Sequence, residues 1–262
     1  MQHATSGNVY ETERMVADYL LFHYGTAEQV SGGRPVPMEG VGFVGRVVRL
    51  GFLRADLGEG KRVLDLGCAV GGASFELARF GAAVVGVDLS GAFIEAAKVM
   101  RDAGRVRTFR TEEGVRRTAL ELERPCDGVV AARVEFRRGD AMALDADLDG
   151  LDAVLMANLV DRLPAPRRCL AEVGRRMRPG GVVVVTSPYT WMPEYASGEE
   201  WLGGGREAGE SGDSAREMGE ALGREFRLER RVDVPFLIRE HARKFQWSEA
   251  ELTVWRKGAQ PG

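Results

Sequence analysis

Residues 62–88 read RVLDLGCAVGGASFELARFGAAVVGVD, and this stretch decides the fold. A largely apolar run from Val63 to Leu66 is followed by glycines, by a helical segment from Ala73 to Phe80, and by a second apolar run that ends in Asp88. Such apolar runs are typical of parallel strands that are covered on both faces. Glycines let the backbone turn sharply and approach a ligand at the N-terminus of the following helix. The stretch therefore predicts half of a nucleotide-binding crevice.

One acid in this stretch, Asp65, favours S-adenosylmethionine over a dinucleotide as the ligand. The pattern Gly67-x-Ala69-x-x-Gly72 followed by an acid is also a loose dinucleotide fingerprint. Asp65, however, lies two residues before the first glycine, where it would attract the ammonium group of S-adenosylmethionine and repel a pyrophosphate. Asp88 would accept hydrogen bonds from both ribose hydroxyls. A nicotinamide dehydrogenase is the weaker alternative.

Later landmarks resemble those of class I methyltransferases. Gly139-Asp140-Ala141 follows a strand predicted over 134–138, and Arg178-Pro-Gly-Gly181 precedes another over 182–187. Asp140 is placed to accept a hydrogen bond from the adenine amino group. We therefore predict a Rossmann-like α/β fold with a seven-stranded, mostly parallel sheet, helices on both faces and added N-terminal helices. The predicted cofactor-binding residues are Asp65, Gly67, Cys68, Ala69, Gly71, Asp88, Leu89, Asp140, Ala141 and Asn158.

Composition narrows the class of protein and its partners. The chain has 262 residues, a net charge of −3 and dispersed basic residues, which argues against a nucleic-acid partner. No run approaches the roughly 20 apolar residues of a membrane span. The three cysteines, Cys68, Cys126 and Cys169, form an odd number without metal-ligand spacing. We therefore expect a cytoplasmic protein without a metal, and Cys68 to be a buried thiol rather than a nucleophile.

The chain divides into a cap and a core. Residues 1–57 are predicted to form an N-terminal helical cap, with Asn8 or Thr12 capping the first helix and Gly25 ending it. Residues 58–262 form the core, with an insertion at 105–132 that reads as a solvated hairpin or helix. Residues 196–213 carry six glycines, which suggests a mobile flap. The connection 235–247 is so dense in polar and aromatic residues that we expect it to contact a ligand.

Six blocks of sequence resemble the methyltransferase of ovothiol biosynthesis. They are residues 8–12 (NVYET), 19–25 (YLLFHYG), 65–71 (DLGCAVG), 158–162 (NLVDR), 187–191 (SPYTW) and 235–247 (PFLIREHARKFQW). The resemblance implies methylation of 5-thiohistidine (4-mercaptohistidine) on the imidazole π nitrogen, giving ovothiol A. The block 158–162 is also similar to a segment of protein-histidine methyltransferases, which supports imidazole as the acceptor.

The family often occurs as the C-terminal domain of a larger enzyme whose iron-dependent part makes the carbon–sulfur bond. The resemblance here is to the stand-alone form. It implies that the iron-dependent sulfoxide-forming enzyme of the same pathway is a candidate partner that supplies 5-thiohistidine.

Within this resemblance we expect Asp161 and Asn158 to be catalytic. Asp161 would accept a hydrogen bond from the far ring nitrogen, which leaves the near nitrogen free to attack. Asn158 would hold the ring edge or the amino-acid arm, and Arg239 would bind the substrate carboxylate. The other predicted substrate-binding residues are Tyr19, His23, Tyr189, Trp191 and His241, the last with a salt-linked structural role as an equal alternative.

Two other functions remain open from the sequence. One is a methyltransferase for another small amino acid or imidazole compound. The other is a catalytically silent protein that binds S-adenosylmethionine.

Overall fold

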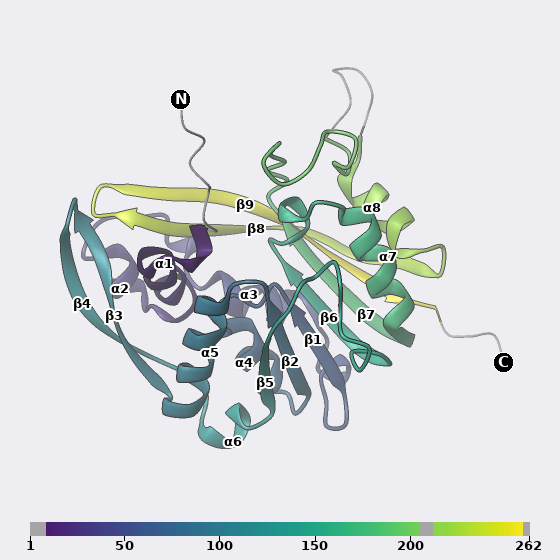
Figure 1. Cartoon of the computed structure of the whole chain (residues 1–262), viewed down its shortest axis with the longest axis horizontal. Helices are drawn as coiled ribbons and strands as arrows, with labels where there is room; N and C mark the ends of the chain where they lie inside the picture. Colours follow the sequence, from purple (N-terminus) through teal and green to yellow (C-terminus); the bar gives the residue numbers. More distant parts are fainter. Residues whose placement is uncertain (1–8, 205–211, 259–262) are drawn as a thin grey trace.

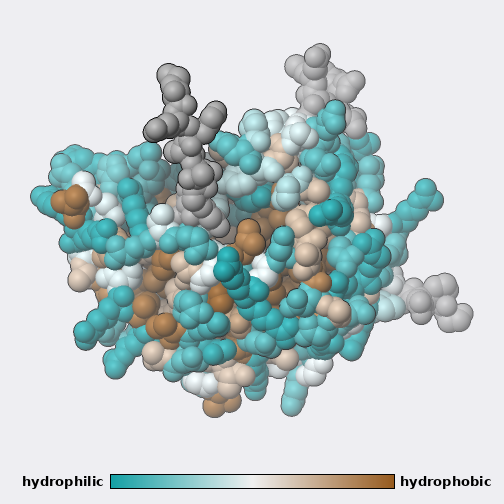
Figure 2. Space-filling view, in the orientation of Figure 1, coloured by the Kyte–Doolittle hydropathy of each residue, from teal (hydrophilic) through white to brown (hydrophobic). Residues whose placement is uncertain are grey.

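The computed structural model of the chain describes residues 9–204 and 212–258 (Figure 1). Asn8, one of the two predicted helix caps, and residues 205–211 of the predicted flap lie outside the described residues. Hydrophilic side chains cover most of the face seen in Figure 2, and apolar ones gather in its middle part.

A seven-stranded sheet forms the centre of the molecule, in the order β5-β2-β1-β6-β7-β9-β8. The strands are β1 (Arg62–Leu66), β2 (Ala83–Asp88), β5 (Val134–Arg138), β6 (Leu151–Ala157), β7 (Met177–Ser187), β8 (Phe226–His241) and β9 (Lys244–Lys257). The first five are parallel, and β9 runs antiparallel to both β7 and β8. The strand order reverses between β1 and β6, where open α/β sheets form their ligand crevice. The predicted fold is confirmed.

Helices cover both faces of this sheet. Along β7, Val182 and Val184 belong to one buried cluster and Val183 and Val185 to the other, as the two-residue period of a strand requires. The first cluster packs under α3 (Phe43–Gly51), α4 (Gly72–Ala78), α5 (Gly91–Ala103) and α6 (Gly128–Ala131). The second packs under α7 (Pro166–Arg176) and α8 (Ser214–Leu222). Both faces are therefore buried, which explains the apolar runs of the central strands.

The N-terminal cap is held by α1 (Glu13–Tyr24) and α2 (Ala27–Ser31). The Thr12 hydroxyl accepts a hydrogen bond of 3.2 Å from the Met15 amide, and Gly25 ends the helix. The prediction that Thr12 caps this helix is confirmed. Leu20 and Leu21 are buried and fix α1 against the rest of the molecule.

Two hairpins meet beside this cap. The insertion forms an antiparallel hairpin of β3 (Arg105–Glu113) and β4 (Arg116–Glu123). Strands β8 and β9 extend beyond the sheet toward it, across α1 and α2 (Figure 1). Residues 235–247, expected to be a ligand-contacting connection, are instead the paired ends of these two long strands. One residue of this range, Ile238, lines a cavity of the structure, so contact of the range with a ligand stays a prediction.

Arg239 joins the two hairpins and the cap. Its Nη1 donates to the carbonyls of Val30 and Ser31 at 3.1 and 3.0 Å, and its Nη2 donates to Glu112 at 2.7 Å. The Glu112 carboxylate also accepts hydrogen bonds from Arg110 and Thr118. Because Arg239 is only 4% exposed, this network replaces its hydration.

We expect Arg239→Ala to lower the free energy of unfolding by about 3 kcal/mol, because Glu112 loses a charged donor and the carbonyls of Val30 and Ser31 each lose a hydrogen bond. In a chain of this size the loss corresponds to about 5–10 °C in Tm. Thermal unfolding measures it, with the exposed Arg243→Ala as the matched control. A Tm equal to that of the control would contradict the structural role.

Candidate functional site

A cavity of about 450 Å³ lies at the carboxyl ends of β1, β2, β5 and β6. Its wall on the side of the cap is formed by aromatic and aliphatic side chains, among them Phe22, Phe43, Val44 and Val47. A cavity of this size suits a ligand of nucleoside class together with a small second molecule.

The turn after β1 forms the floor of the cavity. Gly67 and Ala69 have φ values of 77° and 47°, and the amides of Gly67 and Cys68 donate to the Val87 carbonyl. A Cβ added to Gly67 would lie 3.0 Å from the Leu159 side chain, so glycine is needed there. Gly67, Cys68 and Ala69 line the cavity. Burial raises the pKa of the Cys68 thiol well above its usual value, which leaves the thiol protonated.

Gly71 does not line the cavity, in contrast to its predicted contact with the cofactor. Its φ is 87°, and an added Cβ would lie 2.4 Å from the Phe136 ring. The glycine therefore allows the turn to pack on β5, and it shapes the site from behind.

Asp65 reaches the cavity from the end of β1 and is almost fully buried. Its Oδ2 accepts a hydrogen bond of 2.6 Å from the Ser74 hydroxyl. Burial raises the pKa of Asp65 to about 7, and the hydrogen bond from the Ser74 hydroxyl offsets part of this rise. A cationic ligand group in the cavity would stabilise the ionised carboxylate, so this position fits an ammonium group.

Asp88 ends β2 with its carboxylate on the cavity wall. Oδ2 accepts from the Ala69 amide and Oδ1 from the Ser90 amide, both at 2.9 Å. Each oxygen keeps a further lone pair, so the carboxylate is fixed in orientation and can accept from a diol. Leu89, Asp140 and Ala141, three other predicted cofactor-binding residues, also line the cavity.

The short helix η1 (Val9–Glu11) is attached to the start of α5. The Ser90 hydroxyl donates to the Tyr10 carbonyl at 3.0 Å, and Glu11 accepts from the amides of Gly91 and Ala92 at 2.9 and 3.1 Å. A carboxylate is favourable at a helix N-terminus. These contacts place the Tyr10 ring on the cavity wall, 6.1 Å from the Tyr19 ring.

His23 connects the cap to the turn that follows β1. Its Nδ1 accepts a hydrogen bond of 3.1 Å from the Gly72 amide, and a Cβ added to Gly72 would lie 2.7 Å from that nitrogen. Burial lowers the pKa of His23 to about 3, so the ring is neutral at physiological pH. His23 and Tyr19 both line the cavity, which is compatible with their predicted contact with the substrate.

The neutral His23 predicts a pH dependence of stability. Its folded-state pKa of about 3 lies below its usual value of 6.5, so its contribution is complete above about pH 6.5 and is lost as the pH falls toward 3. We expect the wild type to lose about 2 kcal/mol more than His23→Gln between pH 8 and pH 5, as measured by urea unfolding. Asp65, whose pKa is raised, acts in the opposite direction, but it is present in both proteins and cancels. Equal losses in the two proteins would contradict this prediction.

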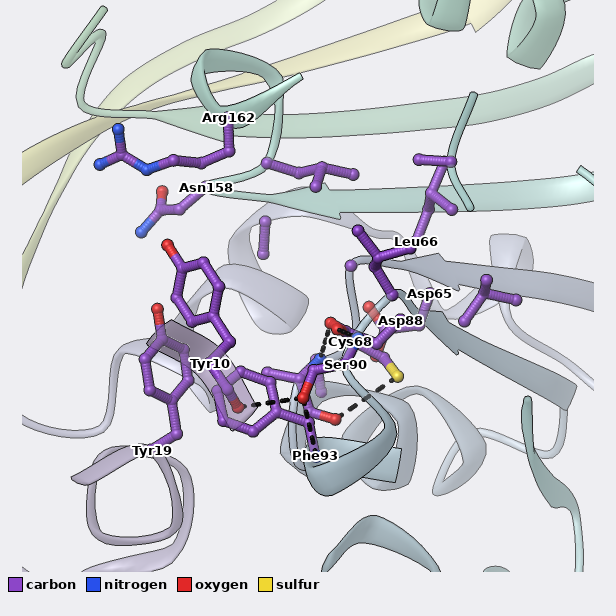
Figure 3. A pocket seen from close by; sticks show the side chains of 18 of the residues that line it. Tyr10, Tyr19, Asp65, Leu66, Cys68, Asp88, Ser90, Phe93, Asn158 and Arg162 are labelled. Atoms are coloured by element: carbon purple, nitrogen blue, oxygen red, sulfur yellow. Dashed lines mark hydrogen bonds between the residues drawn. The ribbon is translucent and has the colours of Figure 1, made fainter. Parts of the chain in front are cut away.

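Asn158 lies on the opposite wall, at the carboxyl end of β6. Its φ is 50°, a conformation that is uncommon outside glycine and is found near functional sites. The Thr186 hydroxyl donates to its Oδ1 at 2.8 Å, which leaves the amide nitrogen of Asn158 for a ligand. In Figure 3 the Asn158 side chain lies beside Arg162, and the hydroxyls of Tyr10 and Tyr19 point toward this pair.

Besides Gly71, five predicted site residues do not line the cavity. Asp161 is 1% exposed, and its Oδ2 accepts from the Thr190 amide at 3.0 Å. Tyr189 donates to Glu251 at 2.5 Å, with its ring stacked on Trp191 within the second buried cluster. Arg239 is committed to Glu112, and His241 accepts from the Arg243 amide near the end of the β8–β9 hairpin. The structure does not bring these five side chains to the cavity wall, although Asp161 Oδ1 and Trp191 Nε1 are buried without a hydrogen-bond partner among the described residues. Their predicted contacts with the substrate stay predictions.

Sequence reasoning assigned no role to Arg162, Tyr195 or Phe93, although all three line the cavity. Arg162 belongs to the NLVDR block, in which the sequence suggests roles only for Asn158 and Asp161. Tyr195 carried no local signal, because the segment after β7 has no regular secondary structure at that point.

The comparisons with known proteins agree with this geometry. A family model described as a methyltransferase domain matches residues 57–202. A ubiquinone biosynthesis O-methyltransferase of Maricaulis maris is 27% identical over 172 residues, 60% of this chain and 58% of that protein. The chain thus spans about half the length of the curated relatives it matches.

Solved structures share the fold. A putative methyltransferase from Bacillus halodurans has a TM-score of 0.53 at 15% identity and covers 82% of this chain and 99% of its own. The N-terminal domain of EvdMO1, solved in the presence of S-adenosylhomocysteine and D-fucose, has a TM-score of 0.50 at 19% identity over 83% of each chain.

Fold, cavity and family model together define a class I S-adenosylmethionine-dependent methyltransferase. The chain belongs to the methyltransferase domain family, and its cofactor is S-adenosylmethionine. Within the described residues, no three histidine, cysteine or acidic side chains gather as a metal site would require. No helix of that part of the chain is long and apolar enough to cross a lipid bilayer.

Proposed function

We propose that the protein methylates the imidazole π nitrogen of 5-thiohistidine, giving ovothiol A. The proposal rests on the NLVDR block, whose Asn158 and Arg162 line the cavity across from the aspartates of the nucleotide crevice. The same block is similar to protein-histidine methyltransferases, which act on the same ring.

The residues around the crevice suit S-adenosylmethionine. Asp65 would hold the ammonium group, Asp88 the ribose hydroxyls, and Asp140 the adenine amino group, with Leu89 and Ala141 beside the ring. Gly67, Cys68 and Ala69 would lie under the ligand. When bound, S-adenosylmethionine supplies the electrophilic methyl group.

Methyl transfer demands little acid–base chemistry from the protein. Fixed side chains on the cavity wall can align a ring nitrogen for attack, which supplies much of the rate enhancement. A neutral imidazole has one nitrogen with a free lone pair, and the acceptor of the other N–H determines which one it is.

That acceptor must face the cavity. Asp161 is held by the Thr190 amide behind the wall, whereas the hydroxyl oxygens of Tyr10 and Tyr19 point into this region (Figure 3). Burial raises the pKa of Tyr19 to about 12, so its hydroxyl stays protonated and can both accept and donate. We therefore assign the orientation of the ring to these tyrosines rather than to Asp161.

The supply of 5-thiohistidine by an iron-dependent sulfoxide-forming enzyme remains a prediction of the family resemblance. Pull-down with that enzyme would test physical contact, which transfer of the free intermediate does not require.

Incubation with labelled donor tests the proposed acceptor. Histidine, 5-thiohistidine, a histidine peptide and a phenolic acceptor are compared, and the label is located by mass spectrometry. We expect methylation of 5-thiohistidine on the π nitrogen. Methylation of another member of the panel alone would replace the proposed substrate, and donor binding without any product would indicate a catalytically silent protein.

A further inference from the structure

Arg162 is positioned differently from the other arginines around the site. It ends the short helix η4 (Val160–Arg162) that follows β6, and its side chain is 27% exposed. Among the described residues that line the cavity, it is the only lysine or arginine. His23 adds no positive charge, because burial lowers its pKa to about 3. Arg162 is therefore the single cation facing the ligand within the described wall.

The guanidinium of Arg162 is held from one side. Nη1 donates to the Thr190 carbonyl at 3.0 Å and lies 3.5 Å from the Met192 sulfur. Its central carbon is 5.1 Å from the centroid of the Tyr195 ring, in a cation–π arrangement. Within the described part of the chain, all its hydrogen bonds come from Nη1, so Nε and Nη2 are left for a ligand.

No carboxylate neutralises this guanidinium by a direct hydrogen bond among the described residues. The nearest ion pair is with Asp161 at 3.9 Å, and that carboxylate accepts from the Thr190 amide instead. Arg239 shows the contrast, since its Nη2 donates directly to Glu112 at 2.7 Å. An arginine that is oriented but has no direct hydrogen bond to a carboxylate is suited to an anionic ligand.

The neighbouring groups also favour an anion. The Asn158 amide nitrogen has no role in the hydrogen bond that fixes its Oδ1. The hydroxyls of Tyr10 and Tyr19 point toward the same place, and that of Tyr10 is also hydrogen-bonded to the Tyr195 hydroxyl at 3.4 Å (Figure 3). Hydrogen-bond donors thus converge on one corner of the cavity, while the acids Asp65, Asp88 and Asp140 line another part of its wall. The cavity therefore has an acidic part that suits S-adenosylmethionine, the methyl donor, and a cationic corner that suits the methyl acceptor.

We propose that Arg162 forms a subsite for the carboxylate of the acceptor, so that the acceptor is a small molecule with a free carboxyl group. Nε and Nη2 would bind the two carboxylate oxygens, and the Asn158 amide would contact the same end of the molecule. This inference rests on the proposed function for the identity of the acceptor, and it excludes neutral acceptors and peptides with a blocked carboxyl group.

Calorimetry on the complex with S-adenosylhomocysteine tests the subsite. Two pairs of ligands are compared, 5-thiohistidine with its decarboxylated analogue and histidine with histamine. We expect Arg162→Gln to weaken the carboxylate members about 10- to 100-fold, the effect of a lost charge-assisted pair. The decarboxylated members should bind both proteins equally, and affinity for S-adenosylhomocysteine should not change.

Two further variants complete the test. Arg162→Lys should recover only part of the loss, because an ammonium group cannot form the bidentate pair. The exposed Arg168→Gln is the control and should leave all affinities at the wild-type value. Equal weakening of both members of a pair in Arg162→Gln, or no weakening of either, would overturn the subsite, as would a wild type that binds no member of either pair.

The outcomes separate this inference from the proposed function. Binding of carboxylated ligands that depends on Arg162, without methylation of 5-thiohistidine, would reject the proposed substrate and retain the subsite. Methylation of 5-thiohistidine with the same efficiency in Arg162→Gln would retain the function and reject the subsite.

Discussion

Asp88→Ala is expected to raise the Kd for S-adenosylhomocysteine by about 100-fold or more, because a ribose would lose two charge-assisted hydrogen bonds. The carboxylate is held in place by the amides of Ala69 and Ser90, so little entropy is lost when it binds a diol. Calorimetry on the purified protein measures the change.

Two controls accompany this experiment. Asp149→Ala removes an exposed acid away from the cavity and should bind S-adenosylhomocysteine normally. Asp88→Asn keeps one acceptor oxygen, so its affinity should lie between those of the wild type and Asp88→Ala. A folded Asp88→Ala protein with wild-type affinity would remove this residue from the ribose site.

Asn158→Ala is expected to lower kcat for methyl transfer by about 100- to 1,000-fold, the usual effect of removing one fixed donor from an active site. Affinity for S-adenosylhomocysteine should change by only a few-fold, because the amide lies beside Arg162 and away from Asp65 and Asp88 (Figure 3). Initial rates under saturating donor, combined with calorimetry, separate the two effects.

Asn158→Gly is the matched control for the backbone. The native φ of 50° is strained for alanine and not for glycine, so Asn158→Gly keeps the backbone conformation while removing the same amide. Equal loss of kcat in the two variants assigns the effect to the amide. Recovery of activity in the glycine variant would assign it to the turn.

The crevice could be predicted because its determinants are local. Gly67 and Asp88 lie within one strand–helix–strand unit, and the two-residue period of Val182–Val185 marks a strand that is covered on both faces. The caps at Thr12 and Ser90 also follow from short patterns that act within one helical turn.

The substrate side could not be predicted in the same way, because it depends on contacts between distant segments. Arg239 donates to Glu112, which lies 127 positions away on the inserted hairpin. The sequence around either residue contains no pattern that predicts this pairing. Arg162 and Arg239 have the same chemistry, so only the three-dimensional arrangement shows that one is paired internally and the other faces the cavity.

The cap also changes what should be regarded as the functional unit. The match to the family model begins at residue 57, whereas Tyr10, Tyr19, His23 and Phe43 contribute one wall of the cavity. A shortened chain starting at that boundary would retain the sheet and the glycine turn but would open the acceptor chamber to bulk water. Exchange of the N-terminal cap between related enzymes would therefore be a direct way to change the methyl acceptor while the cofactor-binding core stays the same.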